Sequence, residues 1–269
     1  MEKNQKLNLS PSRISDFQTC PQLYKYRSIE KLPERPGLDA LRGSIVHLIL
    51  ENIFDLDKNL RTLENAQQKI SETTEYFLNN DPNLFCALDQ SIAFPNTNKF
   101  QTSKENMELL KKEISDLLTN YFKIENPKNI NPKSREELIE YELTPEILLK
   151  GYVDRIDESE QGLIRINDYK TGKAPNENFV NKAMFQLKFY AYIIYQKVNK
   201  VPKSLRLIYL KDSQVLTYEP TSLDMQLTEK RILNIAQQIS NAIKEDNFPA
   251  TTSKLCDYCY FKKICPAYN

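Results

Sequence analysis

KGYVDRIDESEQGLIRINDYKTG, residues 150–172, is the stretch that decides the fold predicted for this chain of 269 residues. Lys150 to Asp157 and Leu163 to Lys170 are rich in β-branched and aromatic residues, and polar residues with a glycine separate them. This pattern is typical of two short strands joined by a turn. Residues at i and i+2 of a strand share a face, so charged residues of the two strands converge if their faces coincide.

Two aspartates and a lysine carry the chemistry of this stretch: Asp154, Asp168 fourteen positions later, and Lys170 two residues beyond. Neighbouring carboxylates resist ionising together unless a cation lies between them. Oxygen ligands of this kind suit Mg²⁺ or Mn²⁺, which lower the pKa of a bound water and neutralise charge on a phosphate under attack. Lys170 is placed to orient or deprotonate that water, or to stabilise the developing charge. These residues fit metal-assisted phosphodiester hydrolysis, which is the more specific interpretation. An ordinary surface hairpin is the alternative, because short motifs often match by chance.

A histidine and a helix face add candidate residues. The one histidine of the chain, His47, stands beside an apolar stripe at helical spacing, and a neutral imidazole is a suitable further ligand for a carboxylate-held metal. Phe179 to Lys200 is predicted to form a helix on which Gln186 and Tyr190 share a face, with Lys182 one turn earlier. Such a face suits binding a phosphate, stacking a base or supporting the lysine of the strand pair. The plainer alternatives are a histidine at the edge of a core and a solvated helix face.

Four of the five cysteines gather towards the two ends of the sequence: Cys20, Cys256, Cys259 and Cys265. The spacing C-x2-C-x5-C followed by proline, completed by one distant cysteine, suits a [4Fe-4S] cluster or a structural zinc ion. The polar start MEKNQKLNLSPSR lacks the apolar region of a secretory signal, so we expect a reducing, cytoplasmic location in which these thiols bind metal instead of forming disulfides. Cys86 has the character of a small apolar residue without a partner.

Net charge alone does not indicate a nucleic-acid-binding protein, because it is only +1 at pH 7. Basic residues are nevertheless concentrated around the proposed site, and we expect Arg155, Lys173 and Lys182 to contact phosphates, with solvated surface as the alternative. No segment is long and apolar enough to span a membrane. The sequence has no glycine-rich phosphate loop with a Walker lysine, so a motor that unwinds DNA would have to be another chain.

The order of these motifs resembles a known family. Cys20, GSIVH ending at His47, GYVDRID, NDYKTG, QLKFY and the cysteine triplet follow one another as in the RecB-like branch of the PD-(D/E)XK nucleases. The iron-sulfur exonucleases of that branch, which include CRISPR-adaptation nucleases and the nuclease domain of AddB-type recombination proteins, are the most similar. The resemblance runs from about Leu9 to Pro266.

The resemblance implies roles for individual residues. His47, Asp154 and Asp168 would bind Mg²⁺ or Mn²⁺ together with the backbone carbonyl of Tyr169, and Lys170 would be catalytic. Gln186 and Tyr190 would act in the QxxxY motif of the family. The four terminal cysteines would hold a [4Fe-4S] cluster, with zinc as the alternative.

The expected fold is a restriction-endonuclease-like mixed central sheet flanked by helices, of the α/β class. Helices are expected up to about residue 123. Strands are expected near Glu137–Leu143, Ile147–Asp157, Leu163–Lys170, Leu205–Leu210 and Gln214–Glu219. A crossover helix is expected before residue 205, and a long helix at Leu223–Glu245. We expect one nuclease domain over residues 1–269, with a helical insertion at about 57–130 that carries no family motif. Segments 9–27 and 250–269 would bind the cluster as an iron-sulfur tail.

The functional prediction is a metal-dependent DNA nuclease, specifically an exonuclease on single-stranded DNA or DNA ends that serves repair, recombination or CRISPR adaptation. DNA is the expected partner, with a helicase or a CRISPR-adaptation protein as a candidate partner in another chain. The alternative from another class is an iron-sulfur nucleic-acid-binding or adaptor protein that does not cleave. A third is a zinc-stabilised structural protein.

Overall fold

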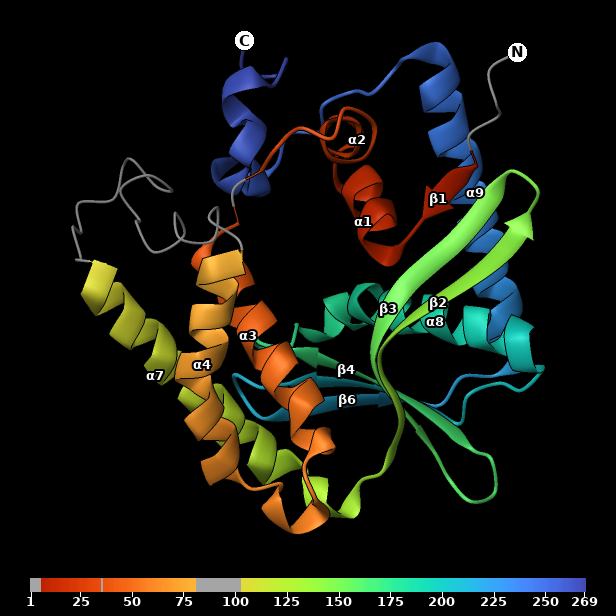
Figure 1. Ribbon diagram of the computed structural model, residues 1–269. Coiled ribbons are helices and arrows are strands. Elements are labelled where there is room, and N and C mark those ends of the chain that lie inside the picture. Colours follow the sequence, from red (N-terminus) through yellow and green to blue (C-terminus); the bar gives the residue numbers. More distant parts are fainter. Residues whose placement is uncertain (1–5, 35, 81–102) are drawn as a thin grey trace.

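The computed structural model describes residues 6–34, 36–80 and 103–269, so Cys86 and the stretch around it lie outside the described residues. A six-stranded mixed sheet forms the centre, in the order β1-β3-β4-β5-β6, with β2 also paired to β3 (Figure 1). The strands are β1 (Leu7–Leu9), β2 (Pro132–Thr144), β3 (Ile147–Glu158), β4 (Ile164–Lys170), β5 (Ser204–Tyr209) and β6 (Gln214–Tyr218).

Helices cover both faces of this sheet. They are α1 (Pro11–Thr19), α2 (Pro21–Tyr24), α3 (Leu38–Asn52), α4 (Leu63–Asn80), α7 (Ser103–Ile124), α8 (Glu177–Val198) and α9 (Ser222–Glu245). Short helical turns connect them: η1 (Lys25–Ile29), η2 (Ile53–Asp55), η3 (Lys58–Leu60), η5 (Pro127–Asn129), η6 (Lys254–Tyr258) and η7 (Tyr260–Ile264). The predicted mixed sheet flanked by helices is therefore confirmed, and α4 and α7 lie within the range of about 57–130 in which helices were expected.

The strand pair predicted from residues 150–172 is present. β3 and β4 run antiparallel, with register pairs from Arg155 and Asn167 to Glu158 and Ile164. The crossover helix α8 returns the chain to β5, which pairs with β4 in parallel, as expected for two strands joined by a helix. The strand β1 was not predicted; its three residues pair in parallel with the start of β3.

Alternation along β5 separates two cores. Leu205 and Leu207 belong to a core shared with α1, α8 and α9, whereas Ile208 belongs to a second core shared with α3, α4 and α7. Successive strand residues point to opposite faces, so this one short strand supplies both layers. The result is a three-layer arrangement in which α3 and α8 lie on opposite faces of the sheet near β3 and β4.

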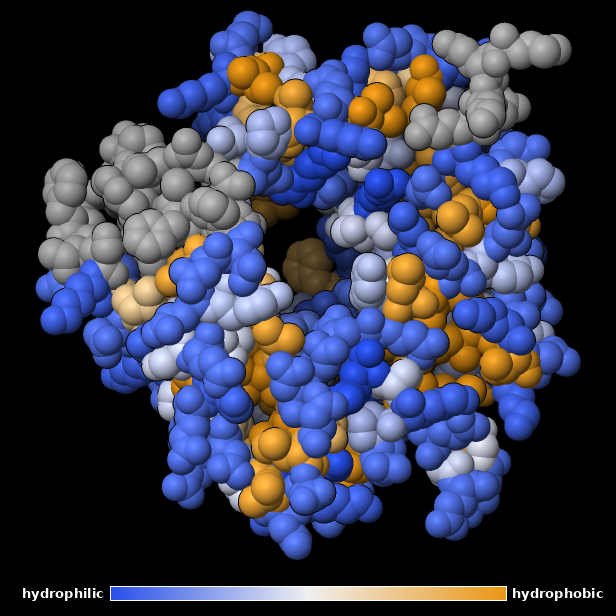
Figure 2. Space-filling view, in the orientation of Figure 1, coloured by the Kyte–Doolittle hydropathy of each residue, from blue (hydrophilic) through white to orange (hydrophobic). Residues whose placement is uncertain are grey.

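The surface is hollowed near the middle of the face that Figure 2 shows, between α1 on one side and the α3 and α4 side of the molecule on the other. The segment that follows α9 lies beside α2, so parts of the chain far apart in sequence meet there (Figure 1). Among the described helices, none is long and apolar enough to cross a membrane.

Candidate active site

The predicted aspartate pair lies where β3 and β4 separate. The β-ladder between them ends at Arg155 and Asn167, one residue before Asp154 and Asp168 would pair. In its place the Asp154 carboxylate accepts a hydrogen bond from the Tyr169 backbone N–H at 2.6 Å. Both aspartates are buried, with 9% of Asp154 and 1% of Asp168 exposed. The separation of the strands thus holds two carboxylates together inside the protein.

Helix α3 brings His47 to the same place. Its Nε2 atom lies 3.0 Å from the carbonyl oxygen of Tyr169, and its Nδ1 atom lies 3.5 Å from Oδ2 of Asp154. The apolar stripe of α3 is buried against α4 and α7, which fixes the half-buried imidazole at the edge of the core. Three members of the predicted metal set, an imidazole, a carboxylate and a backbone carbonyl, are therefore close together.

Asp168, next to Asp154, is held by Lys170 of β4 and by Gln186 of α8. Its Oδ2 atom lies 2.6 Å from Nζ of Lys170, and its Oδ1 atom accepts a hydrogen bond from the Gln186 amide at 2.8 Å. The Gln186 carbonyl accepts from Lys170 at 2.8 Å, and its amide nitrogen lies 3.0 Å from the Tyr190 hydroxyl. Asp168, Lys170, Gln186 and Tyr190 thus form one hydrogen-bonded chain from β4 to α8.

Gly151 explains how α8 approaches β3 so closely. A Cβ atom at this position would lie 2.5 Å from Cε1 of Tyr190, closer than side-chain carbons come in proteins. The missing side chain lets the Tyr190 ring lie directly on the strand. The motif glycine therefore serves the placement of the helix that carries Gln186.

Burial and like charge shape the protonation of the site. Burial raises the pKa of Asp154 to about 7, and the nearby charge of Asp168 adds to this shift. Burial alone lowers the pKa of His47, but the carboxylates of Glu136, Asp154 and Asp168 outweigh it and raise that pKa to about 9. The site is rich in negative charge that a cation would offset, which fits the donors that divalent metal ions prefer.

Lys170 is held as a cation by the same carboxylates. Burial lowers its pKa, but the charge of Asp168 outweighs this effect and leaves the pKa above its ordinary value. A charged ammonium donates hydrogen bonds and stabilises negative charge, and it has no lone pair with which to take a proton.

Glu136 of β2 is a site residue that sequence analysis missed. It stands opposite Asp154 in the register of β2 and β3, yet it is left out of the ladder and has a positive φ of 42°. Its carboxylate, His47 and Asp154 each offer a ligand atom, and these atoms all lie within 4.8 Å of one another. A glutamate in a left-handed conformation is uncommon, and no pattern in a run of charged residues signals it. The register of β2 against β3 is the signal that would have found it.

The residues expected to contact phosphates have different surroundings. Arg155 is fully buried, with 0% exposed, and its guanidinium pairs with Glu125 at 2.8 Å and with Asp157 at 3.1 Å. The expectation that Arg155 contacts DNA is therefore wrong, because its side chain lies on the face of β3 that packs against α7 and cannot reach a ligand. Lys173 and Lys182 are exposed.

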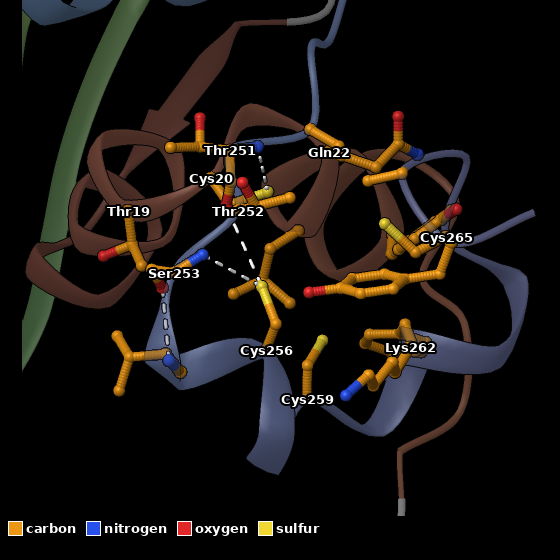
Figure 3. A pocket seen from close by; sticks show the side chains of 17 residues that line it. Thr19, Cys20, Gln22, Thr251, Thr252, Ser253, Cys256, Cys259, Lys262 and Cys265 are labelled. Atoms are coloured by element: carbon orange, nitrogen blue, oxygen red, sulfur yellow. Dashed lines mark hydrogen bonds between the residues drawn. The ribbon is translucent and has the colours of Figure 1, made fainter.

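The four cysteines meet around a second pocket. Cys20 at the junction of α1 and α2 and three cysteines of the tail line one cavity, and Figure 3 shows their sulfur atoms directed into it. All four thiols are free. The backbone N–H groups of Thr251 and Ser253 donate to the sulfurs of Cys20 and Cys256 at 3.4 and 3.3 Å.

Packing around this pocket also joins the two distant segments. The Tyr26 hydroxyl donates to the carbonyl of Ile264 at 2.8 Å, and its ring centroid lies 5.2 Å from that of Phe261. Tyr24 is buried between Phe17 and Phe248. These tyrosines therefore pack against protein beside Cys20.

Comparisons with known proteins address the family and the fold. The family model described as PD-(D/E)XK nuclease superfamily matches residues 8–266. A solved structure of a candidate exonuclease from Eubacterium rectale superposes with a TM-score of 0.53 at 14% sequence identity, and the match covers 95% of this chain and 87% of that one. The solved structure of SSO0001 matches with a TM-score of 0.44 at 16% identity, covering 100% and 89%. No curated protein sequence matches the chain.

Proposed function

Because the chain belongs to the PD-(D/E)XK nuclease superfamily, we propose that it is a deoxyribonuclease that uses Mg²⁺ or Mn²⁺ to hydrolyse phosphodiester bonds. Within that activity we propose an exonuclease that acts on single-stranded DNA or DNA ends. The observation that carries the proposal is the close approach of His47, Glu136 and Asp154, beside the chain of hydrogen bonds from Asp168 to Tyr190.

We assign the metal to the imidazole and carboxylates at the separation of β3 and β4. His47, Asp154 and the carbonyl of Tyr169 would hold it with Asp168, as the family resemblance implies, and Glu136 is a further ligand by its position. The raised pKa of Asp154 supports this assignment, since buried carboxylates without a cation share protons. A bound divalent cation supplies a water of lowered pKa and neutralises charge on the phosphate.

The remaining residues of the site contact the phosphate or position the groups that do. The Lys170 ammonium is placed to donate hydrogen bonds to the phosphate under attack and to stabilise its developing negative charge. Gln186 holds that ammonium through its carbonyl and holds Asp168 through its amide, so it positions both. Tyr190 supports Gln186 in turn.

The test is an assay on end-labelled single- and double-stranded DNA with magnesium, manganese or chelator. Wild type should cleave only with metal, and Asp168→Ala and Lys170→Ala should each lose at least about a hundredfold in rate, the size of one general acid-base or charge-stabilising contribution. Lys112→Ala, which removes an exposed lysine of α7, is the matched control and should cleave as wild type does. Equal rates for wild type and both site variants would refute the site. A protein that binds DNA and never cleaves it would be the adaptor alternative.

We further propose that Cys20, Cys256, Cys259 and Cys265 hold a [4Fe-4S] cluster, which supports placement in the iron-sulfur branch of the family. The four thiols line one pocket, and the sulfurs of Cys20 and Cys256 accept hydrogen bonds from backbone N–H groups, which stabilise thiolates.

This cluster would stabilise the fold by tying together distant segments. Joining residue 20 to residue 256 removes about 5 kcal/mol of unfolded-state freedom by the loop-closure relation. A purified sample that is brown and absorbs at about 400 nm would support the assignment, and a colourless protein with stoichiometric zinc would overturn it.

The organisation as one domain over residues 1–269, with an insertion at about 57–130, is part of the proposal. So are a cytoplasmic location, a role in repair, recombination or CRISPR adaptation, and a helicase or adaptation protein as partner.

A further inference from the structure

A basic groove leads away from the proposed active site. It lies between α1, the β2–β3 ribbon and the first half of α8, and its volume is about 820 Å³. Lys170, Gln186 and Tyr190 line one end of it, so the groove opens directly onto the proposed catalytic lysine. A cavity of this size accommodates a drug-sized ligand and hence at least one nucleotide.

The charge of the groove is of one sign. Lys150, Lys170, Lys182 and Arg231 line it, and the described residues contribute no carboxylate to its walls. Lys150 and Lys182 make no ion pair within the described part of the chain, so both are available to a ligand. This contrasts with the net charge of the whole chain, which is only +1. A groove with this concentration of positive charge attracts a polyanion.

Two aromatic rings stand exposed on its walls. Tyr152 on β3 and Phe179 at the start of α8 each have 59% of their surface exposed. Rings this exposed cost free energy in water, and they are the platforms on which unstacked bases lie in proteins that bind single strands. Bases inside a duplex present only their edges, so a duplex would gain nothing from these rings.

Tyr152 also joins the groove to the metal side of the site. It lines a neighbouring pocket together with His47 and Glu136. A strand that followed the groove past Tyr152 would therefore have one phosphate near the proposed metal ligands and Lys170. Three further polar residues of the groove, Ser12, Ser15 and Gln18, lie on the exposed side of α1 and can donate hydrogen bonds to a sugar–phosphate backbone.

We propose that this groove binds a short run of single-stranded DNA next to the scissile phosphate, with bases stacked on Tyr152 and Phe179 and phosphates held by Lys150 and Lys182. The inference rests on the proposed nuclease function and deepens it by naming the strand form and the residues that select it. The groove thereby favours a single strand over intact duplex.

The test measures binding without cleavage. Fluorescence anisotropy in chelator compares a labelled single-stranded oligonucleotide with a duplex of the same sequence. Tyr152→Ala and Phe179→Ala should each weaken single-strand binding about tenfold, the lower part of the range for one stacked base, and change duplex binding less than twofold. Tyr76→Ala removes a ring of similar exposure from α4 and should change neither.

The lysine variants test the electrostatic part. Lys182→Gln should weaken binding and reduce the slope of log affinity against log salt by about 0.7, as the loss of one phosphate contact to a single strand does, and Lys112→Gln should not. Unchanged single-strand affinity in the double variant Tyr152→Ala with Phe179→Ala, or equal losses for both strand forms, would overturn the proposal. Ring-dependent binding by a wild type that cleaves nothing with magnesium or manganese would instead refute the nuclease function and leave the groove standing.

Discussion

Replacing Arg155 with methionine should destabilise the protein by about 3–5 kcal/mol, the cost of leaving a buried charge without its partner. The guanidinium binds both oxygens of Glu125, at 2.8 and 3.0 Å, and both Arg155 and Glu125 are buried. In the variant, Arg206 is the one ion-pair partner that Glu125 keeps among the described residues, and Asp157 loses one of its partners. The Tyr169 hydroxyl also loses the donor that lies 2.5 Å from it. Small domains are stable by about 5–15 kcal/mol, so this loss is a large share of the total.

Urea unfolding followed by circular dichroism measures this loss. Arg165→Met is the matched control, because Arg165 pairs with the same Asp157 but has 40% of its side chain exposed, and we expect it to cost less than about 1 kcal/mol. Adding Glu125→Gln to Arg155→Met should restore part of the loss, because the buried carboxylate that lost Arg155 is then a neutral amide. A loss below about 1 kcal/mol for Arg155→Met would refute the reasoning.

The same pair predicts a pH dependence. Burial raises the pKa of Glu125, but the bonds from Arg155 outweigh this effect and lower the pKa below its ordinary value. A carboxyl whose pKa is lower in the folded than in the unfolded state contributes stability above the unfolded pKa, and this is lost as pH falls through the folded one. The wild type should therefore lose stability as pH falls below about 4.5. The difference in unfolding free energy between wild type and Arg155→Met should become smaller over that pH range.

Three further predictions concern the two sites. Gly151→Ala should lower the melting temperature and the cleavage rate, since the added Cβ would lie 2.5 Å from the Tyr190 ring. Adding Tyr190→Leu should recover the melting temperature. A normal melting temperature in the single variant would contradict the close packing of Gly151 and Tyr190. Binding of Mn²⁺, measured by calorimetry, should weaken as pH falls below about 7, because protons then compete for Asp154, and Asp154→Asn should weaken binding and flatten this dependence. Cys256→Ser should lower solubility and thermal stability more than the cleavage rate per folded molecule, and a stable, fully active variant would exclude a structural role for the proposed cluster.

The sequence predicted the strands and helices closely because their patterns are local. The turn between the two predicted strands and the helical spacing of the α8 residues depend on neighbours within a few positions, so β3, β4 and α8 lie where they were expected. β1 was missed because three residues are too few for a periodic pattern, and its partner β3 lies about 140 residues away. The pairing of such a strand depends on tertiary contact alone.

The motifs predicted only part of the candidate site, because the positions of its other residues depend on tertiary contacts. Motif order led to His47, Asp154 and Asp168, and the structure brings them together. Arg155 was misjudged because sequence proximity to Asp154 was taken as proximity to DNA, although its side chain lies in the core beside α7. Glu136 was missed because its place depends on a positive φ in β2 and on strand register.

The contact between Tyr26 and Ile264 can form only late in synthesis. The two residues are 238 positions apart, so Tyr26 cannot pack against the C-terminal segment until the ribosome has made the intervening chain. At about 5–20 residues per second, that wait lasts on the order of 10–50 s. The aromatic residues that later pack against the tail are exposed to solvent or to chaperones throughout this interval.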